Sequence, residues 1–356
     1  MDTSRGKRSK IGVLTFHRCI NYGSYWQARC LIDWLRDHGL EAVLIDHESR
    51  RVSFAEFKCA LDPSLPTPAP RKDRPYYREK IKKFYSSFEN LPRSDRLTLE
   101  RPELMDEFDL VIVGSDEVWN LSHPWYGRYE LFFGKGVRAR RLISYAASFG
   151  NYDAWAGLDD ERANHLRGFE AISVRDDNSR TLIRSVLGVD PVKVLDPCLL
   201  HPPEIHFEGS SRKDPYIAVY GHNFSFEFAD SVSRWAKRQQ LETVSIGYRN
   251  DWADVQLLSA DPNEFAELIS GSDGVATNFF HGCVFALNNK RPLVCEAASY
   301  RNNKIVDLLS TLGCEERLMR LPSEPAVAEC LSSPPNIGEK VKDLRRQSEA
   351  FLLSNV

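Results

Sequence analysis

Short hydrophobic runs alternate along the chain with longer segments in which apolar residues recur every three or four positions. Short apolar runs between polar residues are typical of buried parallel strands, and the longer spacing is typical of amphipathic helices. The first pair is a strand at 11–16 and a helix at 25–38, and Gly39 separates them from a second strand at 42–46. This alternation predicts βαβ units and therefore an α/β fold with parallel sheets.

The pattern then continues in two series. Further strands are expected at 108–114, 141–148, 171–175, 216–220, 243–247, 274–277 and 292–294, with helices at 159–168, 226–239 and 262–270. Residues 49–107 carry Pro and charge around one predicted helix at 76–88, so we interpret them as a helical excursion. The Pro-rich and polar stretch 197–215 is typical of a linker.

A chain of 356 residues exceeds the size of about 250–300 at which single cores stop growing. We therefore expect two Rossmann-like domains that face each other across a cleft, with residues 1–205 in the first. Residues 206–356 would form the second domain and end in a terminal helix.

Charge and cysteine content limit the possible partners. The chain has 47 basic and 50 acidic residues, a formal net charge of −3, which gives no global reason to expect nucleic acid or an anionic membrane. No run is apolar enough for a signal or an integral membrane segment, so a cytoplasmic location is expected. The eight cysteines lack paired spacing, which predicts reduced thiols, with no metal and no disulfide.

His281 is the first candidate for chemistry. It precedes Gly282 between a predicted strand at 274–277 and a helical pattern that begins at Val284. Ligands of open α/β sheets bind beyond the carboxyl ends of the strands, which is where this turn would lie. The alternative is a histidine that fills a polar pocket or caps the helix.

Other candidates also lie just beyond predicted strands. Asn21, Tyr22 and Gly23 precede a helix whose free N–H groups could bind an anion, although an ordinary Asn/Gly turn would look the same. Asp116 could bind an acceptor hydroxyl or cap a helix. No GxGxxG or GxxxxGK[ST] motif is present, which argues against nicotinamide dinucleotides and P-loop ATP chemistry.

Two cationic side chains could serve an anionic ligand. Arg175 ends an apolar strand, where a buried guanidinium needs either a ligand anion or a structural ion pair, for which Asp176 and Asp177 are the neighbouring choices. Lys304 stands at the start of an apolar helix, and it could face the cleft or solvent.

Six motifs, in this order, resemble those of the polysaccharide pyruvyl transferase family over about residues 11–320. They are Thr15-Phe16-His17 to Asn21-Tyr22-Gly23, Val113-Gly114-Ser115-Asp116-Glu117-Val118-Trp119-Asn120, Ser144-Tyr145-Ala146-Ala147-Ser148-Phe149-Gly150, Ile172-Ser173-Val174-Arg175-Asp176, Leu195-Asp196-Pro197 and Phe280-His281-Gly282. The resemblance implies a glycosyltransferase-B-like pair of domains. It also implies transfer of a carboxyvinyl group from phosphoenolpyruvate to a sugar, usually leaving a pyruvate ketal.

The resemblance also implies roles for individual residues. The family's Ser-Val-Arg arginine falls on Arg175 and its histidine before glycine on His281, which we take as the catalytic pair. Its lysine falls on Lys304, with Lys290 as the competing position. Candidate substrate-binding residues within or near the motifs are Asn21, Tyr22, Gly23, Ser115, Asp116, Ser148, Gly282 and Lys304. Glu117 departs from the family pattern, in which glutamine is usual, and aromatic residues follow Ser24.

These assignments predict a reaction without a cofactor, in which phosphoenolpyruvate is the donor and a saccharide, possibly lipid-linked, is the acceptor. Arg175 and Lys304 would hold the donor anions, and His281 would protonate its vinyl carbon as a general acid. A nucleotide-sugar glycosyltransferase and a non-catalytic carbohydrate-binding protein are the alternatives. A ligand shared by Arg175 and His281 would require the domains to close over it, with 197–215 as the hinge.

Overall fold

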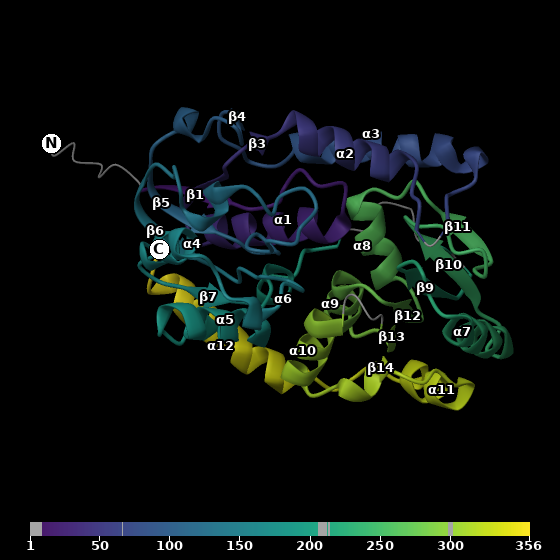
Figure 1. Ribbon diagram of the computed structural model, residues 1–356. Coiled ribbons are helices and arrows are strands. Elements are labelled where there is room, and N and C mark those ends of the chain that lie inside the picture. Colours follow the sequence, from purple (N-terminus) through teal and green to yellow (C-terminus); the bar gives the residue numbers. More distant parts are fainter. Residues whose placement is uncertain (1–8, 66, 206–211, 213, 298–301) are drawn as a thin grey trace, which may run out of the picture.

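The computed structural model describes residues 9–356 except 66, 206–211, 213 and 298–301. Two all-parallel sheets confirm the α/β fold with two Rossmann-like halves (Figure 1). The first has the order β2 (Glu41–Leu44), β1 (Lys10–Leu14), β5 (Phe108–Val113) and β6 (Ala139–Ser144). The second has the order β11 (Val255–Leu257), β10 (Glu242–Ile246), β9 (Tyr216–Tyr220), β12 (Gly274–Thr277), β13 (Leu293–Glu296) and β14 (Leu318–Met319).

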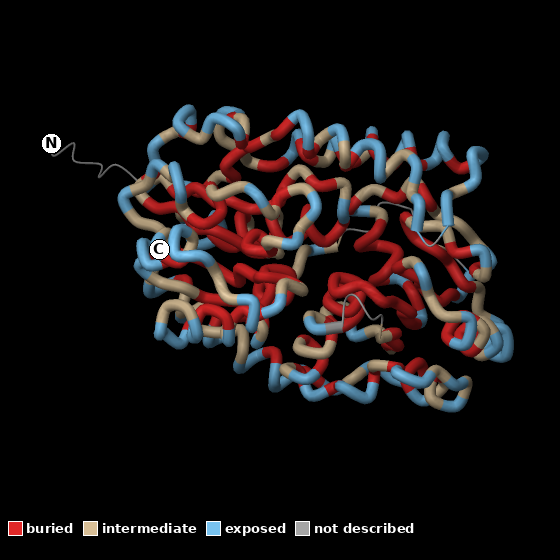
Figure 2. The backbone as a smooth tube through the Cα atoms, viewed as in Figure 1, coloured by how far each residue is buried: buried red, intermediate tan, exposed pale blue. Residues whose placement is uncertain are grey.

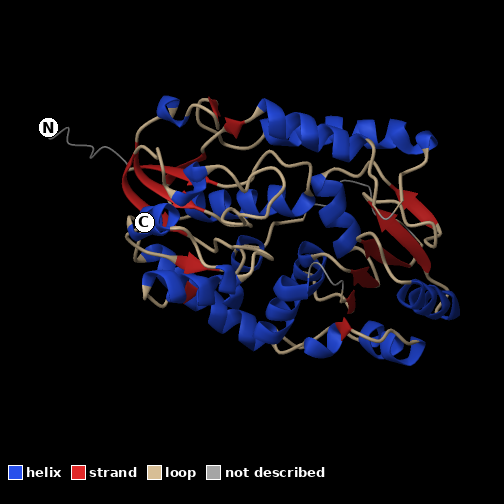
Figure 3. Cartoon of the chain, viewed as in Figure 1, coloured by secondary structure: helices blue, strands red, loops and turns tan. Residues whose placement is uncertain are grey.

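Helices connect and cover these strands (Figure 3). In the first half they are α1 (Tyr22–Asp37), α4 (Asp160–Arg167), α5 (Asp177–Leu187) and α6 (Pro197–Leu200). After the junction come α7 (Phe226–Arg238), α8 (Pro262–Ser270), α9 (Phe280–Asn288), α10 (Asn302–Leu312), α11 (Glu324–Ser332) and α12 (Gly338–Leu353). None of the helices in the described part of the chain combines the length and apolarity needed to cross a membrane.

Two expected strands are shorter than predicted. The run 141–148 leaves the sheet after Ser144, because Ala146 has a left-handed φ of 50° that a strand cannot accommodate. The run 171–175 contributes only β7 (Ser173–Val174), which pairs with β8 (Val192–Lys193). An isolated bridge from Ala171 to Ile143 connects this segment to β6, and a second one joins Val174 to Ala147, just beyond the end of β6.

The excursion predicted at 49–107 contains two long helices, α2 (Arg50–Leu61) and α3 (Arg74–Glu89), and the short strand β4 (Leu97–Thr98), which pairs with β3 (His47–Glu48) just before the excursion. The helices lie along the top of the view in Figure 1 and reach from the first half over the second. Lys80 Nζ donates to the carbonyl of Gly247 at 3.0 Å, and Lys83 pairs with Glu264 at 2.8 Å. The excursion therefore joins the two halves.

The terminal helix returns to the first half. α12 packs on α6, and Leu195 N donates to Ser348 Oγ at 2.9 Å. The chain passes between the halves through the predicted linker 197–215, most of which is either α6 or lies outside the described residues. The division at residue 205/206 stays a prediction, and α12 contacts elements on its far side.

One hydrophobic cluster extends through both halves. It includes Ile112 of the first sheet and Val275 of the second, and α1 bridges them because Tyr22 stacks on Phe265 at 4.4 Å between ring centroids. Figure 2 shows the buried backbone continuing from one sheet to the other. The halves therefore share a packed interface around the site.

Candidate functional site

The strands of both sheets lead into one cleft of about 320 Å³. Asp116 follows β5 and Arg175 follows β7, while His281 lies in the first turn of α9, just after β12. All three line the cleft together with Asn21 and Lys304. Because the carboxyl ends of parallel strands meet there, the position matches that expected for ligands of open α/β sheets.

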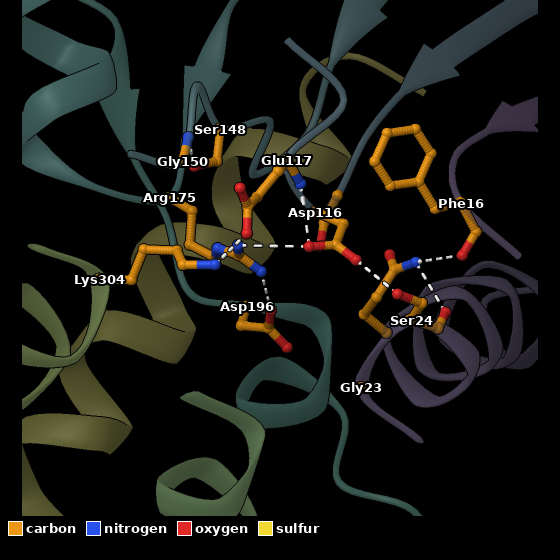
Figure 4. A network of polar contacts seen from close by, with 12 residues as sticks. Phe16, Gly23, Ser24, Asp116, Glu117, Ser148, Gly150, Arg175, Asp196 and Lys304 are labelled. Carbon is orange, nitrogen blue, oxygen red and sulfur yellow. Dashed lines mark hydrogen bonds and ion pairs between the residues drawn. The ribbon is translucent and has the colours of Figure 1, made fainter. Parts of the chain in front are cut away.

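Arg175 is a buried cation held by two carboxylates (Figure 4). Its NH1 donates to Asp196 Oδ2 at 2.8 Å, and its NH2 lies 3.6 Å from Asp116 Oδ1. Phe280 from the second half covers the guanidinium, with 4.5 Å from CZ to the ring centroid. Its ion pairs are therefore with residues distant in sequence, and not with Asp176 or Asp177, the neighbours considered as structural partners in the sequence analysis.

His281 approaches the same carboxylate from the second half. Its Nε2 lies 3.6 Å from Asp196 Oδ2, so the imidazole and Arg175 share one oxygen atom. Burial alone would raise the pKa of Asp196, but its electrostatic interactions with His281 and Arg175 hold it well below its usual range. Phe279 is the N-cap of α9, so His281 does not cap this helix.

Gly23 makes room for the imidazole. A Cβ atom on Gly23 would lie 2.0 Å from Nδ1 of His281, which shows that the backbone of α1 packs directly against the ring. Gly23 does not line the cleft. Its position therefore supports a role in orienting His281 rather than in contacting substrate.

Lys304 faces the cleft and Lys290 does not. Lys304 Nζ pairs with Glu117, and both side chains are largely buried. Burial would raise the pKa of Glu117, but Lys304 and a hydrogen bond from Asn120 lower it to about 2. Lys290 is exposed beyond the far end of α9. The Lys304 ammonium is thus neutralised by a residue of the site itself.

Asn21 and Tyr22 have structural partners that the sequence did not show. Asn21 lines the cleft, but its Oδ1 caps α1 by accepting from Gly23 N at 2.8 Å and Ser24 N at 3.2 Å. These N–H groups are therefore occupied, which favours the ordinary Asn/Gly turn over the anion-binding helix terminus, the two alternatives that the sequence left open. Tyr22 is buried and donates its hydroxyl to the Ala260 carbonyl at 2.7 Å, so it belongs to the interface between halves.

Three further candidates lie behind the cleft wall rather than in it. Ser148 Oγ donates to Asp176 Oδ2 at 2.5 Å and is fully buried. Ser115 is also buried, and its carbonyl accepts from the hydroxyl of Thr15 at 2.7 Å. Gly282 allows α9 to approach β12, since a Cβ there would lie 2.1 Å from Thr277 Oγ1. Each of these residues stabilises the packing behind the cleft wall. A substrate contact by any of them stays a prediction.

The structure adds a carboxylate that sequence reasoning missed. Glu56 on α2 lines the cleft yet is nearly buried, and burial raises its pKa to about 7. It lies beside the thiol of Cys19. The sequence did carry one signal for Glu56. It lies four residues after Val52, and positions i and i+4 of a helix share one face, which is buried here.

Lys80 of α3 also lines this end of the cleft, and burial lowers its pKa to about 7. Opposite the excursion, Tyr220, Tyr248 and Phe279 line the cleft, with Phe279 edge-on to each tyrosine at 4.9 and 5.3 Å. The cleft therefore has a charged end around Arg175 and an aromatic end beneath α2 and α3. Such an aromatic wall suits the apolar face of an uncharged ring.

Asp196, Cys198 and His281 form a group whose potential ligand atoms all lie within 4.8 Å of one another. Two features disfavour a cation there. Arg175 already occupies the Asp196 carboxylate, and burial raises the pKa of the Cys198 thiol well above its usual range, whereas a metal binds the thiolate. The residues do not fit a metal centre, and the expected absence of a metal stays a prediction.

All eight cysteines are free, and all but Cys59 are buried.

Trp119 is fully buried and donates its Nε1 to the Phe132 carbonyl at 2.8 Å. Trp26 donates to the Pro262 carbonyl at 2.8 Å, so this aromatic residue lies between the halves and outside the cleft.

Residues 21–300 match the model of the polysaccharide pyruvyl transferase family. The chain belongs to this family. The motifs that carry the resemblance also converge in the structure, since Asp116, Arg175, Asp196 and His281 lie around one point. No curated protein matches the chain significantly.

Solved structures with the same fold include two UDP-GlcNAc 2-epimerases. The enzyme from Neisseria meningitidis, bound to UDP-GlcNAc, is 10% identical with a TM-score of 0.52, covering 96% of this chain and 94% of its own. The enzyme from Methanocaldococcus jannaschii is 12% identical with a TM-score of 0.52, covering 98% and 99%. At such identities the likeness shows the glycosyltransferase-B-like fold alone.

Proposed function

We propose that this member of the family transfers the carboxyvinyl group of phosphoenolpyruvate to a sugar hydroxyl and closes a pyruvate ketal. The observation that carries the proposal is the meeting of Arg175 and His281 on Asp196 in a cleft that Lys304 also faces. A donor with a carboxylate and a phosphate needs fixed cations, and its vinyl carbon needs a proton donor. Both kinds of group are present within one site.

In this mechanism Arg175 and Lys304 hold the donor anions, with Arg175 suited to a bidentate contact. His281 donates a proton to C3 as an acceptor oxygen bonds to C2, and the carboxylate of Glu56 takes the proton of that hydroxyl. Ionised Asp196 stabilises the positive imidazole by Coulomb attraction. A correctly placed acid contributes on the order of 10²–10⁴-fold.

The bond between C2 and the phosphate oxygen then breaks, and its electron pair leaves with phosphate. A second hydroxyl of the same sugar adds to the cationic C2, and its proton goes to the departing phosphate. Exchange with solvent removes the proton from Glu56 and returns one to His281. The aromatic end of the cleft would hold the acceptor ring, and the free thiols fit a reducing compartment such as the cytoplasm.

Ligand-induced thermal stabilisation tests the donor class. A ligand at about 100 times its Kd stabilises by about 2.7 kcal/mol, which is measurable as a rise in Tm. We expect phosphoenolpyruvate to raise Tm and UDP-GlcNAc to leave it unchanged. Stabilisation by the nucleotide sugar alone would instead favour glycosyl transfer, and stabilisation by neither ligand would count against both donors.

A further inference from the structure

The near-neutral net charge of the chain conceals a strong segregation of charge. Residues 50–83, which span α2 and most of α3, contain ten Lys or Arg and four Asp or Glu. The rest of the chain, outside residues 50–83, contains 37 basic and 46 acidic residues. The segment 50–83 is therefore a basic surface on an acidic protein, which the net charge of −3 does not reveal.

The cations of this segment are mostly unneutralised. Six exposed side chains have no ion-pair partner within the described part of the chain: Arg50, Lys58, Arg71, Lys72, Arg78 and Lys82. The acidic residues of the segment are mostly engaged, since Glu56 and Asp73 are buried and Asp62 pairs with Arg74. Glu79 is the exposed carboxylate left on this surface among the described residues.

Exposed apolar side chains accompany these charges. Phe54 is 71% exposed and Leu65 65%, and Phe57, Tyr76 and Tyr85 are exposed on the same two helices. On α2, Phe54 lies one turn from Arg50 and from Lys58, opposite the buried Val52 and Glu56. On α3, Arg78 and Lys82 are likewise one turn apart. Figure 2 shows the outer sides of both helices as exposed along the upper edge of the molecule.

We infer that the outer surface of α2 and α3 docks on an anionic lipid bilayer. Basic side chains are attracted to anionic headgroups, and neighbouring Phe and Leu side chains insert at the boundary with the acyl chains. A nucleic acid would match the charge equally well, but it would not use the apolar tips of Phe54 and Leu65. The combination of unpaired cations with exposed aliphatic and aromatic groups therefore favours the bilayer.

The surface adjoins the cleft. Cys59 of α2 and Leu65 of the following loop line it, as do Tyr77 and Lys80 of α3. Docking would bring the aromatic end of the cleft close to the headgroups. This consequence, unlike the docking itself, rests on the proposed function: an acceptor sugar on a lipid carrier would reach the cleft without leaving the membrane.

Vesicle sedimentation of the whole protein without substrates tests the inference. We expect binding to phosphatidylcholine vesicles with about 30 mol% phosphatidylglycerol, weak binding to pure phosphatidylcholine, and loss of binding as salt rises. Arg78→Glu with Lys82→Glu should lower the partition coefficient at least about tenfold, because each basic residue contributes severalfold. Lys340→Glu with Lys342→Glu on exposed α12 is the matched control and should bind as the unmodified protein does.

Phe54→Ser with Phe57→Ser should weaken vesicle binding severalfold and leave its salt dependence unchanged. Equal binding to both vesicle types, no binding to either, or an equal loss in the α12 control would overturn the inference. So would binding to a DNA duplex as tight as to anionic vesicles and insensitive to the Phe changes. Because no substrate is present, failure here would leave the donor test of the proposed function unaffected.

Discussion

Arg175 combines a structural role with the donor-binding role that we propose for it. Its ion pairs with Asp196 and Asp116 keep the guanidinium fixed, and the buried side chain lines the cleft, where the proposed donor would meet it. The sequence predicted that a buried cation here needs an anion. It could not predict which one, because Asp116 and Asp196 become neighbours only when the strands assemble.

Arg175→Ala should weaken phosphoenolpyruvate binding, since a lost charge-assisted hydrogen bond costs about 1.5–3 kcal/mol. Arg175→Lys should restore binding only in part, because an ammonium cannot form the bidentate contact. Calorimetric titration of the three proteins checks this order. Equal donor affinity in all three would leave Arg175 with its ion pairs as its sole role.

Glu117→Gln should tighten donor binding several-fold. The carboxylate neutralises Lys304, and an amide of the same shape would free the ammonium for a donor anion and remove a nearby negative charge. The dissociation constant of phosphoenolpyruvate measures the effect, and Glu161→Gln, which breaks an exposed ion pair with Lys135, is the control. Weaker binding in Glu117→Gln would mean that the ion pair positions Lys304 for the donor.

The base role proposed for Glu56 predicts a pH dependence of definite sign. As a base it must be ionised, and because burial raises its pKa to about 7, turnover should fall as pH drops through about 7. Glu56→Gln should lower turnover by about 10²-fold or more and remove this acidic limb. Initial rates between about pH 5.5 and 9 test this prediction. If the variant showed the same fall in turnover at low pH, that fall would belong to another titrating group.

At the scale of elements, the strength of the local signal decided what the sequence could predict. Strands β1, β5, β9 and β12 are continuous apolar runs, and α8 begins with a Pro after a capping Asp261, so these elements fall within a residue or two of the prediction. β7 is a two-residue part of the strand predicted at 171–175, and its partner β8 was not predicted, because these short strands depend on pairing with each other. No local pattern predicts such pairs.

The contact between α1 and α9 is the clearest case of an element that positions the site. Gly23→Ala should lower Tm, because a Cβ 2.0 Å from Nδ1 of the buried His281 overpacks this contact at a cost of about 1–3 kcal/mol, which exceeds the helix preference of Ala. The added Cβ would displace the His281 ring, so turnover should fall toward that of His281→Ala. Thermal unfolding and initial rates together separate the two effects.

Gly338→Ala in the first turn of α12 is the matched control, because a Cβ there meets no atom within 4 Å. It should preserve both Tm and turnover. If Gly23→Ala kept full turnover, the packing of α1 would have no role in orienting His281.

At the scale of the molecule, the sequence predicted two halves and a cleft but not how firmly they are joined. The halves are joined in part by residues of the excursion, which carries no strong strand pattern, and in part by contacts outside it. Arg249 of the second half pairs with Asp73 at 3.0 Å, and Asn288 donates to the carbonyl of Cys198 at 2.7 Å. These partners are far apart in sequence, so only the assembled fold reveals them.

These contacts between the halves change the expectation that the halves close over a ligand. Arg175 and His281 already meet at Asp196, and the Tyr22–Phe265 stack holds the halves together, so no large hinge motion is needed to form a shared site. Small-angle scattering should therefore give the same radius of gyration with and without saturating phosphoenolpyruvate. A marked decrease on donor binding would show that the free protein in solution is more open than the arrangement described above, and that the halves close over the donor after all.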